Sequence, residues 1–461
     1  LRACPRRALL ACSTVNPRHP LPPDHLDLVD MEMKPSKKGY AYRPSTVAKL
    51  IALMRSVLFA VRETARITHI RVRFHREISA IIHERASIVI KTWFFTAQHE
   101  QDPDFYFGHL PQLLSKKDID CILMGDNLGT ATNGSFAFGL FKSNRKAIPE
   151  LALVPWWAPA SVLIDQITTS LLLTKLSRNN KIPLFSAIAS RASLQCLKLA
   201  TLSHALHFYS AKRAVEIWQP KAFMTLYEGQ PWEKVAWLGT KTASNGCITM
   251  GYQHTIVMPH SWGLINPHHD SWEYPAPDMV LALGPKTEEM MKIGHQTLGT
   301  KFSIFGSFRH LNSDKSMMSP RPFQHVVLVV PEGLMEEAIL LFNRGIQAAI
   351  STPSYMFIFR CHPVLPFDRV RDHLSIDPSS ISNIEVSNNK TIDEDISRSS
   401  VVLYRGSSVV LYGIMAGLKP FYFNEQGYPY VDPLFQLPDW RESVDTVTNF
   451  SEALRNYGMM E

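Results

Sequence analysis

The sequence lacks the short motifs that mark several common nucleotide-binding and hydrolytic enzymes. It contains no Gly-x-x-x-x-Gly-Lys-Ser/Thr loop, no Gly-x-Gly-x-x-Gly after an expected strand and no Gly-x-Ser-x-Gly elbow. Asp102-Pro103-Asp104 has the letters of an Asp-x-Asp metal-nucleotide motif, but it precedes an aromatic segment and does not end a strand. These absences favour a metal-independent transfer reaction that uses no cofactor.

Closely spaced cysteines are also missing. The six cysteines lie far apart and form no Cys-x-x-Cys pair, which argues against a zinc ribbon or a secreted disulfide scaffold and fits a reducing cytosol. His260, His268, His269 and Asp270 match no strong ligand spacing, so we expect no metal site.

No hydrophobic run reaches the roughly 20 residues that a membrane-spanning helix needs. The stretch from Leu50 to Val61 contains Arg55, and the stretch from Leu151 to Ile164 contains two prolines. We therefore expect a cytoplasmic protein, with peripheral contact at the inner face of the membrane left open.

Acidic residues are scarce in the first part of the chain. Residues 1–76 contain 15 Lys and Arg but only 5 Asp and Glu, a balance of +10, whereas the remainder has a balance of −3. An anionic membrane is a natural partner for such a segment, although a solvated basic tail is commoner. Apolar residues recur with helical spacing from Thr46 to His75, which predicts either a peripheral membrane helix or a helix packed on its own domain. We expect no nucleic-acid partner.

The length of 461 residues predicts two domains. Expected strands alternate with expected helices, which favours α/β domains with parallel sheets and active residues at the carboxyl ends of the strands. The architecture that we infer is two Rossmann-like domains facing a cleft. Its expected parts are a basic, Pro-rich extension (1–45), an acceptor-side domain (46–275), a nucleotide-binding domain (276–440) and a C-terminal helix that packs back onto the first domain (441–461).

Two polar segments follow expected strands near the C-terminal end. Arg360-Cys361-His362-Pro363 ends the apolar run from Tyr355, and Arg405-Gly406-Ser407-Ser408 ends the run from Val401. His362, Arg360 and Arg405 are candidates to donate to phosphate oxygens, and serines at a helix start favour an anion. Alone, the histidine could be satisfied by local backbone and the serines could be a helix cap. Their occurrence in one sheet favours a shared phosphate site.

Two further strand ends supply second-rank candidates. Glu332-Gly333 follows the strand that ends at Val330, and Gly306-Ser307-Phe308-Arg309 follows the strand that ends at Phe305. Gly333 would let the backbone approach a ligand, Glu332 could hold a ribose hydroxyl, and Arg309 could neutralise a diphosphate. Ordinary turn residues are the alternative for each.

The densest signal in the first domain is Tyr-Glu-Gly-Gln-Pro-Trp-Glu, residues 227–233. Glu228 follows a strand and could act as a general base or position an acceptor hydroxyl, with Gln230 beside it. Glu233 is a second catalytic candidate, but it lies in the first turn of the next helix, where an acid is favoured whatever the function, so Glu228 ranks above it. Gln253 and His254 follow the next strand and are expected near Glu228, His254 as a proton carrier.

At these residues the chain resembles bacterial GT-B glycosyltransferases of surface-carbohydrate biosynthesis, the O-antigen and capsule group. More loosely, it is similar to sialyltransferases, polysialyltransferases, Kdo transferases and CDP-glycerol glycerophosphotransferases. Those families share an acidic residue before Gly, a His-Pro motif and a Ser-Ser or Ser-Thr motif. Glu228-Gly229, His362-Pro363 and Ser407-Ser408 match these three motifs, and the resemblance covers roughly Lys221 to Gln426.

The resemblance implies a nucleotide sugar as donor and a glycan or lipid-linked acceptor. By it, His362, Ser407 and Ser408 bind the phosphate of a cytidine nucleotide, as CMP or CDP, and Glu228 is the catalytic acid or base. Two rival hypotheses stay open: a nucleotide-sugar epimerase on the same fold, and a non-catalytic glycan-assembly protein.

Overall fold

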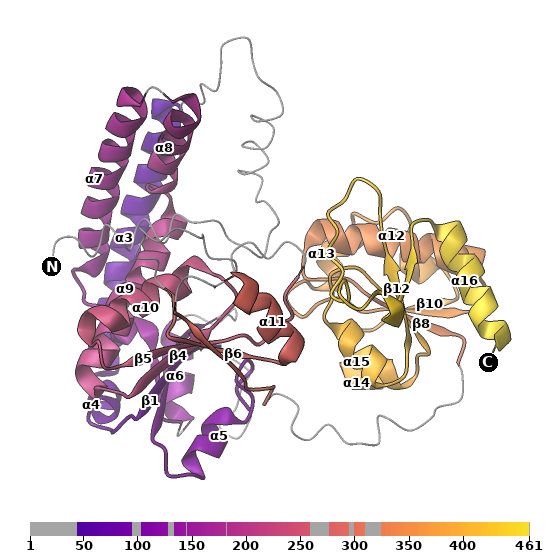
Figure 1. Cartoon of the computed structure of the whole chain (residues 1–461), viewed down its shortest axis with the longest axis horizontal. Helices are drawn as coiled ribbons and strands as arrows, with labels where there is room; N and C mark the ends of the chain where they lie inside the picture. Colours follow the sequence, from indigo (N-terminus) through magenta and orange to yellow (C-terminus); the bar gives the residue numbers. More distant parts are fainter. Residues whose placement is uncertain are drawn as a thin grey trace. The chain divides into compact units, whose positions relative to one another are not determined.

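The computed structural model describes residues 44–94, 103–127, 133–143, 145–180, 182–258, 276–294, 299–308 and 324–460. These residues fall into two compact units, shown in Figure 1. Unit 1 holds the described residues up to 254 and from 276 to 308, and unit 2 holds residues 255–258 and 324–460. Nearly all of the expected N-terminal extension lies outside the described residues, as do Arg309, His260 and the segment 268–270.

Unit 1 is built on a seven-stranded, fully parallel sheet with the order β3-β2-β1-β4-β5-β6-β7. The strands are β1 (Ile88–Phe94), β2 (Cys121–Asn127), β3 (Ala147–Pro149), β4 (Ala222–Leu226), β5 (Ile248–Tyr252), β6 (Met279–Ala282) and β7 (Lys301–Ile304). Because both faces of a parallel sheet are covered, the central strands consist almost entirely of buried residues.

The helices of unit 1 cover both faces of this sheet. They are α3 (Thr46–Arg73), α4 (His75–Ile82), α5 (Leu110–Ser115), α6 (Asn133–Lys142), α7 (Ala158–Asn179), α8 (Pro183–Gln195), α9 (Leu199–Trp218), α10 (Pro231–Ala243) and α11 (Pro285–Gly294), with a 3-10 turn, η1 (Glu150–Ala152). Alternate strand residues serve alternate faces: Val89 and Phe223 pack with α3, α9 and α10, whereas Ile90 and Met224 pack with α5 and α6.

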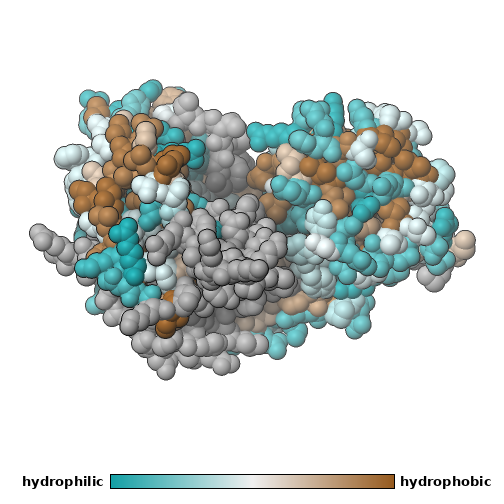
Figure 2. Space-filling view, turned by 90° about the horizontal axis from the view of Figure 1, so that it is seen from above, coloured by the Kyte–Doolittle hydropathy of each residue, from teal (hydrophilic) through white to brown (hydrophobic). Residues whose placement is uncertain are grey.

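Three helices of unit 1, α3, α7 and α8, lie against one another and form an arm that extends beyond the sheet (Figure 1). Much of the outer surface of this arm is apolar, as the hydrophobic areas at the left of Figure 2 show. Exposed large apolar residues occur on all three helices: Val47, Leu50, Ile51, Met54, Val57, Leu58 and Val61 on α3, Ile164, Leu171, Leu172 and Leu176 on α7, and Phe185 and Ile188 on α8.

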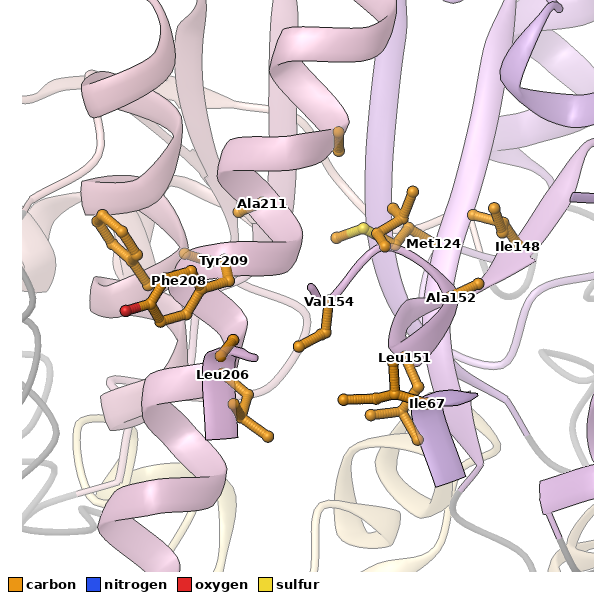
Figure 3. Packing of buried hydrophobic residues seen from close by; sticks show 14 of the residues in the cluster. Ile67, Met124, Ile148, Leu151, Ala152, Val154, Leu206, Phe208, Tyr209 and Ala211 are labelled. Atoms are coloured by element: carbon orange, nitrogen blue, oxygen red, sulfur yellow. The ribbon is translucent and has the colours of Figure 1, made fainter. Parts of the chain in front are cut away.

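At the base of the arm, α3 is anchored in the main core. Figure 3 shows Ile67 of α3 beside Leu151 and Val154, with Leu206 of α9 on the other side of the cluster. Ile67 is fully buried, so this part of α3 is fixed by packing, in contrast to the exposed residues of its first turns.

Unit 2 is built on a six-stranded parallel sheet with the order β10-β9-β8-β11-β12-β13. Its strands are β8 (Val326–Val330), β9 (Met356–Phe359), β10 (Ile384–Val386), β11 (Val401–Tyr404), β12 (Lys419–Phe423) and β13 (Glu442–Val444). Its helices are α12 (Met335–Ser351), α13 (Phe367–Arg371), α14 (Ile392–Ser397), α15 (Val409–Met415) and α16 (Val447–Met460), with 3-10 turns η4 (Pro378–Ser380) and η5 (Pro438–Trp440).

The prediction of two Rossmann-like α/β domains is confirmed, but the predicted boundary at residue 276 is wrong. β6 pairs with β5 and β7 pairs with β6, so both strands extend the sheet of unit 1. The irregular composition between Met258 and Pro277 resembles a linker, yet it connects two neighbouring strands of one sheet.

Two smaller expectations are also corrected. The apolar run from Leu151 to Pro155 has the composition of a strand and is one of the strands expected from the sequence. It does not form a strand, because β3 ends at Pro149 and the chain turns through η1, with Leu151 and Val154 buried in the core. The C-terminal helix belongs to unit 2, since Phe450 and Leu454 of α16 are part of the core that includes α12.

Candidate active site

Glu228 and His254 meet at the carboxyl edge of the unit 1 sheet. Glu228 follows β4 and His254 follows β5, and the two strands are direct neighbours. Nε2 of His254 lies 2.6 Å from Oε1 of Glu228, and both side chains are buried. The imidazole N–H donates to the carboxylate, which fixes the tautomer in which Nδ1 is the acceptor nitrogen. The predicted proximity of the two residues is confirmed.

The loop that carries Glu228 is held by the carboxylate of Glu233. Its two oxygens accept hydrogen bonds from the backbone N–H groups of Glu228, Gly229 and Gln230 at 2.9–3.0 Å. Gly229 has a φ of +77°, a conformation that costs a residue with a β-carbon about 1 kcal/mol or more. Glu233 is fully buried at the start of α10, so it positions the loop and is unsuited to the catalytic role we predicted.

An aromatic loop packs against His254 from the other side. The Tyr106 ring meets the imidazole edge-on with a centroid distance of 4.9 Å. Asp104 fixes this loop, because its carboxylate accepts hydrogen bonds from the backbone of Tyr106 and Phe107 and from the Thr92 hydroxyl. Asp104 therefore has a structural task, consistent with setting aside the Asp-x-Asp letters as a metal motif.

Gln253 and Gln230, both predicted on the acceptor side, are buried. The side-chain oxygen of Gln253 accepts a long hydrogen bond of 3.4 Å from the Leu283 N–H, and its side-chain nitrogen has no partner among the described residues. Gln230 precedes the first residue of α10 and donates its backbone N–H to Glu233. Gln253 thus keeps a donor for a further contact, whereas the backbone of Gln230 belongs to the loop support.

A second buried polar cluster in unit 1 joins side chains of β1, η1 and α9, and we did not predict it. Lys91 in the middle of β1 donates to Glu150 at 2.6 Å, and the other oxygen of Glu150 accepts from His207 at 2.6 Å and from Ser210. Burial alone would raise the pKa of Glu150, but the charges of His207 and Lys91 and their hydrogen bonds outweigh it and hold that pKa below its usual range. A lysine inside the apolar run Ile-Val-Ile-Lys-Thr-Trp-Phe was the available signal.

In unit 2, three neighbouring strand ends bring their polar residues together. β8 lies between β9 and β11, which are followed by His362 and Gly406 respectively. A β-carbon placed on Gly333 would lie 3.0 Å from Nδ1 of His362, and one placed on Gly406 would lie 2.7 Å from the carboxyl carbon of Glu332. These contacts leave no room for a side chain at either glycine, so the predicted grouping of His362, Glu332, Gly333 and Gly406 is observed.

The two serines occupy the same edge of the sheet. Ser407 is buried and its hydroxyl accepts a long hydrogen bond of 3.4 Å from Val409, while Ser408 is exposed at the N-cap of the short helix α15. Pro363 follows His362 in the turn after β9. Hydroxyl and imidazole groups of this kind can donate to phosphate oxygens.

The two arginines predicted to bind the donor both contact carboxylates of the protein itself. Arg405 is buried, and its guanidinium donates to Glu337 and to the carbonyl oxygens of Phe423 and Pro429. Arg360 donates to the buried carboxylate of Asp395 at 2.6 Å. Because the donor groups of Arg405 are engaged inside the protein, its predicted ligand role is corrected. The hydrogen bonds of Arg360 all leave from Nη1 and its side chain is 23% exposed, so its contact with the donor stays a prediction.

Glu332 has an unusual acidity. Burial, with the negative charge of Glu337 adding to it, raises the pKa of Glu332 to about 7, although Arg405 acts in the opposite direction. The carboxyl group is therefore partly protonated at neutral pH, and as a neutral acid it can donate a hydrogen bond to an anion or a hydroxyl.

The described residues contain no group of three or more His, Cys, Asp or Glu side chains that could hold a metal ion. The four cysteines in the described part of the chain, Cys121, Cys196, Cys247 and Cys361, are free thiols. The described residues therefore hold two separate candidate groups, the Glu228–His254 pair in unit 1 and the group of His362, Glu332 and Ser407 in unit 2.

No protein-family model matches the chain, and no curated protein matches it. Among solved structures, it is similar to the glycotransferase of kitacinnamycin, with a TM-score of 0.44 and 12% identity over 81% of this chain and 91% of that chain. It is also similar to the UDP-GlcNAc 2-epimerase from Neisseria meningitidis bound to UDP-GlcNAc, with a TM-score of 0.43 and 11% identity over 80% and 90%. Because these TM-scores lie below 0.5, we infer neither a family nor an activity from them.

Proposed function

We propose that the protein is a glycosyltransferase that uses a nucleotide sugar as donor. The observation that carries this proposal is the convergence of His362, Glu332 and Ser407 on neighbouring strand ends of unit 2. Such an edge is where α/β sheets bind nucleotides. Glycines 333 and 406 let the side chains of His362 and Glu332 pack directly against the backbone at the same place.

In this proposal, unit 2 holds the nucleotide and unit 1 activates the acceptor. The Glu228–His254 pair takes the proton from the acceptor hydroxyl as that oxygen attacks the anomeric carbon of the sugar. The bond from the sugar to the nucleotide phosphate breaks, and the departing phosphate carries the negative charge. Donors from His362, Ser407 and Ser408, aimed at that charge, stabilise the transition state more than the ground state.

We extend this proposal to the nucleotide base, the pathway, the acceptor and the membrane contact. A cytidine nucleotide, CMP or CDP, is the base that the motif resemblance favours, with surface polysaccharide of the O-antigen or capsule kind as the pathway and a glycan or lipid-linked molecule as acceptor. No helix in the described residues is long and apolar enough to cross a membrane. We propose that the apolar arm rests on an anionic membrane from the cytoplasmic side, because residues 46–62 and 166–198 contain no acidic residue.

The nucleotide assignment is tested by the thermal unfolding of the full chain in the presence of CMP, CDP, UDP, GDP and ADP. CMP and CDP are expected to raise the unfolding temperature of unit 2, because a ligand at 100 times its Kd stabilises by about 2.7 kcal/mol. His362→Ala and Ser407→Ala are expected to remove that shift. His373→Ala, which changes an exposed histidine of unit 2, is the matched control and should keep it.

Other results of the nucleotide panel and of an activity assay would favour the epimerase or the non-catalytic protein instead. Stabilisation by UDP or GDP alone would refute the cytidine assignment and keep the glycosyltransferase. Conversion of a nucleotide sugar to its epimer with no acceptor added would favour the epimerase, and absence of any nucleotide-induced shift would favour the non-catalytic hypothesis.

The acidity of Glu332 predicts a pH dependence of nucleotide binding. Its pKa is about 7, so the carboxyl group is neutral below that pH and becomes a negative charge close to the bound phosphate above it. The affinity of the wild-type chain should therefore fall relative to Glu332→Gln as the pH rises from 6 to 8, reaching a difference of roughly tenfold. At each pH, the Kd of the wild-type chain is divided by the Kd of Glu332→Gln, both measured by titration calorimetry. The ionisation of the nucleotide affects both values equally, so it does not change their ratio. A ratio that stays constant across this range would place Glu332 away from the phosphate.

A further inference from the structure

One face of α3 is apolar in the first turns of the helix and basic in the later turns. Val47, Ile51, Met54 and Leu58 form an exposed apolar stripe on the first turns, with Leu58 69% exposed. The same spacing of three and four residues continues through Arg62, Arg66, His69 and Arg73. A single helical face therefore runs from apolar to basic, in a direction that leads from the arm toward the sheet.

The basic half of this stripe lines a cavity of about 860 Å³ between α3 and α6. Its lining includes Arg62, Arg66, His69 and Arg73 from α3 and Gly134 and Ser135 from the first turn of α6. A β-carbon on Gly134 would lie 3.5 Å from Nε2 of His69 and 3.8 Å from Nη1 of Arg73. The N-terminal turn of α6 thus directly faces two basic side chains.

The charges around this cavity are unbalanced. Arg66 and Arg62 both contact Glu63, at 2.5 Å and 3.3 Å, so two positive charges share the one carboxylate that they touch directly. Asp126, in the adjoining cavity, interacts with Arg66 at longer range. Arg73 contacts the Phe74 ring and pairs with no carboxylate in the described part of the chain. The N-terminus of a helix adds about half a positive charge. Like charges that converge on an open cavity repel one another unless an anion occupies it.

We propose that the cavity between α3 and α6 binds the phosphate of an amphiphilic acceptor, a phosphate ester with a long hydrocarbon chain that lies along the apolar half of α3. Guanidinium groups bind phosphate oxygens in pairs, and the backbone N–H group of Gly134 adds a donor at the helix start. The cavity is larger than one phosphate needs, so it has room for a diphosphate or for the first sugar. The inference rests on the proposed function, since it names the class of the acceptor.

The position of the cavity agrees with that role. Asp126 is the last but one residue of β2 and Glu150 follows β3, and both line a smaller cavity of about 230 Å³ that shares Arg62 and Arg66 with the larger one. These strands belong to the sheet whose carboxyl edge also carries Glu228. The phosphate of the acceptor and the group that activates it would therefore be held by the same edge of one sheet.

Binding of decyl phosphate, measured by titration calorimetry below its micelle concentration, tests the proposal on the full chain. Decyl phosphate is expected to bind at least about tenfold more tightly than inorganic phosphate, since part of its chain is removed from water, and decyl maltoside should not bind measurably. The double variant Arg62→Gln/Arg73→Gln should weaken decyl phosphate binding by roughly 10- to 100-fold. Both arginines are exposed, and Glu63 keeps Arg66 as its partner, so the fold should tolerate the change.

Two control variants separate this site from general attraction by a basic protein. Arg55→Gln/Arg76→Gln removes the same charge from exposed positions outside the cavity and should leave the affinity within about twofold. Met54→Ser/Leu58→Ser should weaken decyl phosphate but leave inorganic phosphate unchanged.

Equal losses in the two arginine pairs, or equal affinity for inorganic and decyl phosphate, would overturn the proposal. Vesicles that contain phosphatidic acid distinguish a bilayer headgroup from a single acceptor molecule: the proposal fails if they bind to the chain but monomeric decyl phosphate does not. The nucleotide panel reports on unit 2, so the two proposals can fail separately. If CMP stabilises the chain but decyl phosphate does not bind, this inference alone is refuted. If decyl phosphate binds but no nucleotide stabilises the chain, the proposed function alone is refuted.

Discussion

Replacement of Glu228 by glutamine is expected to lower the rate of sugar transfer by ~10²- to 10⁴-fold, the range for loss of a general base. The amide can no longer accept a proton or hold His254 in one tautomer through a charged hydrogen bond at 2.6 Å. Binding of CMP should be unchanged, because the nucleotide is held in unit 2. The measurement is the turnover of a CMP- or CDP-activated sugar, together with the calorimetric Kd of CMP.

Because Glu228 and His254 act on one proton, their effects should not add. The double variant Glu228→Gln/His254→Asn should be no slower than the poorer of the single variants, as expected for residues that act as a unit. A product of the two separate losses would mean that the pair does not work together, and full activity of Glu228→Gln would end its assignment as part of the base.

The neighbouring Glu233→Gln variant should affect stability, in contrast to Glu228→Gln, which should affect the reaction rate. It disturbs the acceptor of three backbone N–H groups, so it should reduce the free energy of unfolding by about 1–3 kcal/mol, whereas Glu228→Gln should leave unfolding nearly unchanged.

Replacement of Lys91 by methionine should lower the free energy of unfolding of unit 1 by about 3–5 kcal/mol. The change leaves the carboxylate of Glu150 buried and opposed only by His207 and Ser210. Nζ of Lys91 lies 4.4 Å from the Trp93 ring centroid and 4.5 Å from that of Trp232, so tryptophan fluorescence during urea unfolding reports on this region directly.

Two further variants test whether the loss of stability in Lys91→Met comes from the unpaired carboxylate of Glu150. Lys117→Met removes an exposed lysine of unit 1 and should change the free energy of unfolding by less than about 0.5 kcal/mol. Lys91→Met/Glu150→Gln should recover much of the stability, because a neutral amide oxygen can still accept from His207 and Ser210 without a buried charge. A Lys91→Met chain as stable as the wild type would show that the ion pair contributes nothing.

The alternation of apolar strands and amphipathic helices was enough to predict both parallel sheets. Runs such as Val401 to Tyr404, buried on both faces, differ clearly in composition from the segments around them. The sheet to which β6 and β7 belong could not be read from the sequence, since strand partners are chosen by pairing and packing between segments distant in sequence. The long segment between β5 and β6 has the composition of a linker and carries no sign that its two ends lie in one sheet.

At the candidate site, the sequence predicts which polar residues lie at the sheet edge, but it does not predict which groups their side chains contact. Glu228, His254 and His362 were identified because a polar residue directly after a buried strand must lie at the sheet edge. Arg360 and Arg405 satisfy the same rule, but their long side chains reach back to Asp395 and Glu337, partners supplied by other elements. The lysine within the apolar strand β1 marks one member of the Lys91–Glu150–His207 cluster, but no local pattern identifies its partners, because they lie in two other segments.

The membership of β6 and β7 in the first sheet decides how the chain can be divided into fragments. A fragment that ends at residue 275 would leave β5 as an open edge, with the unpaired N–H and C=O groups of Met250 to Tyr252 offered to other molecules. Such an edge promotes aggregation. Soluble production of the two halves therefore calls for a first fragment that continues through residue 308 and a second that starts near residue 324. During synthesis on the ribosome, the first sheet likewise stays incomplete until the residues of β7 have emerged.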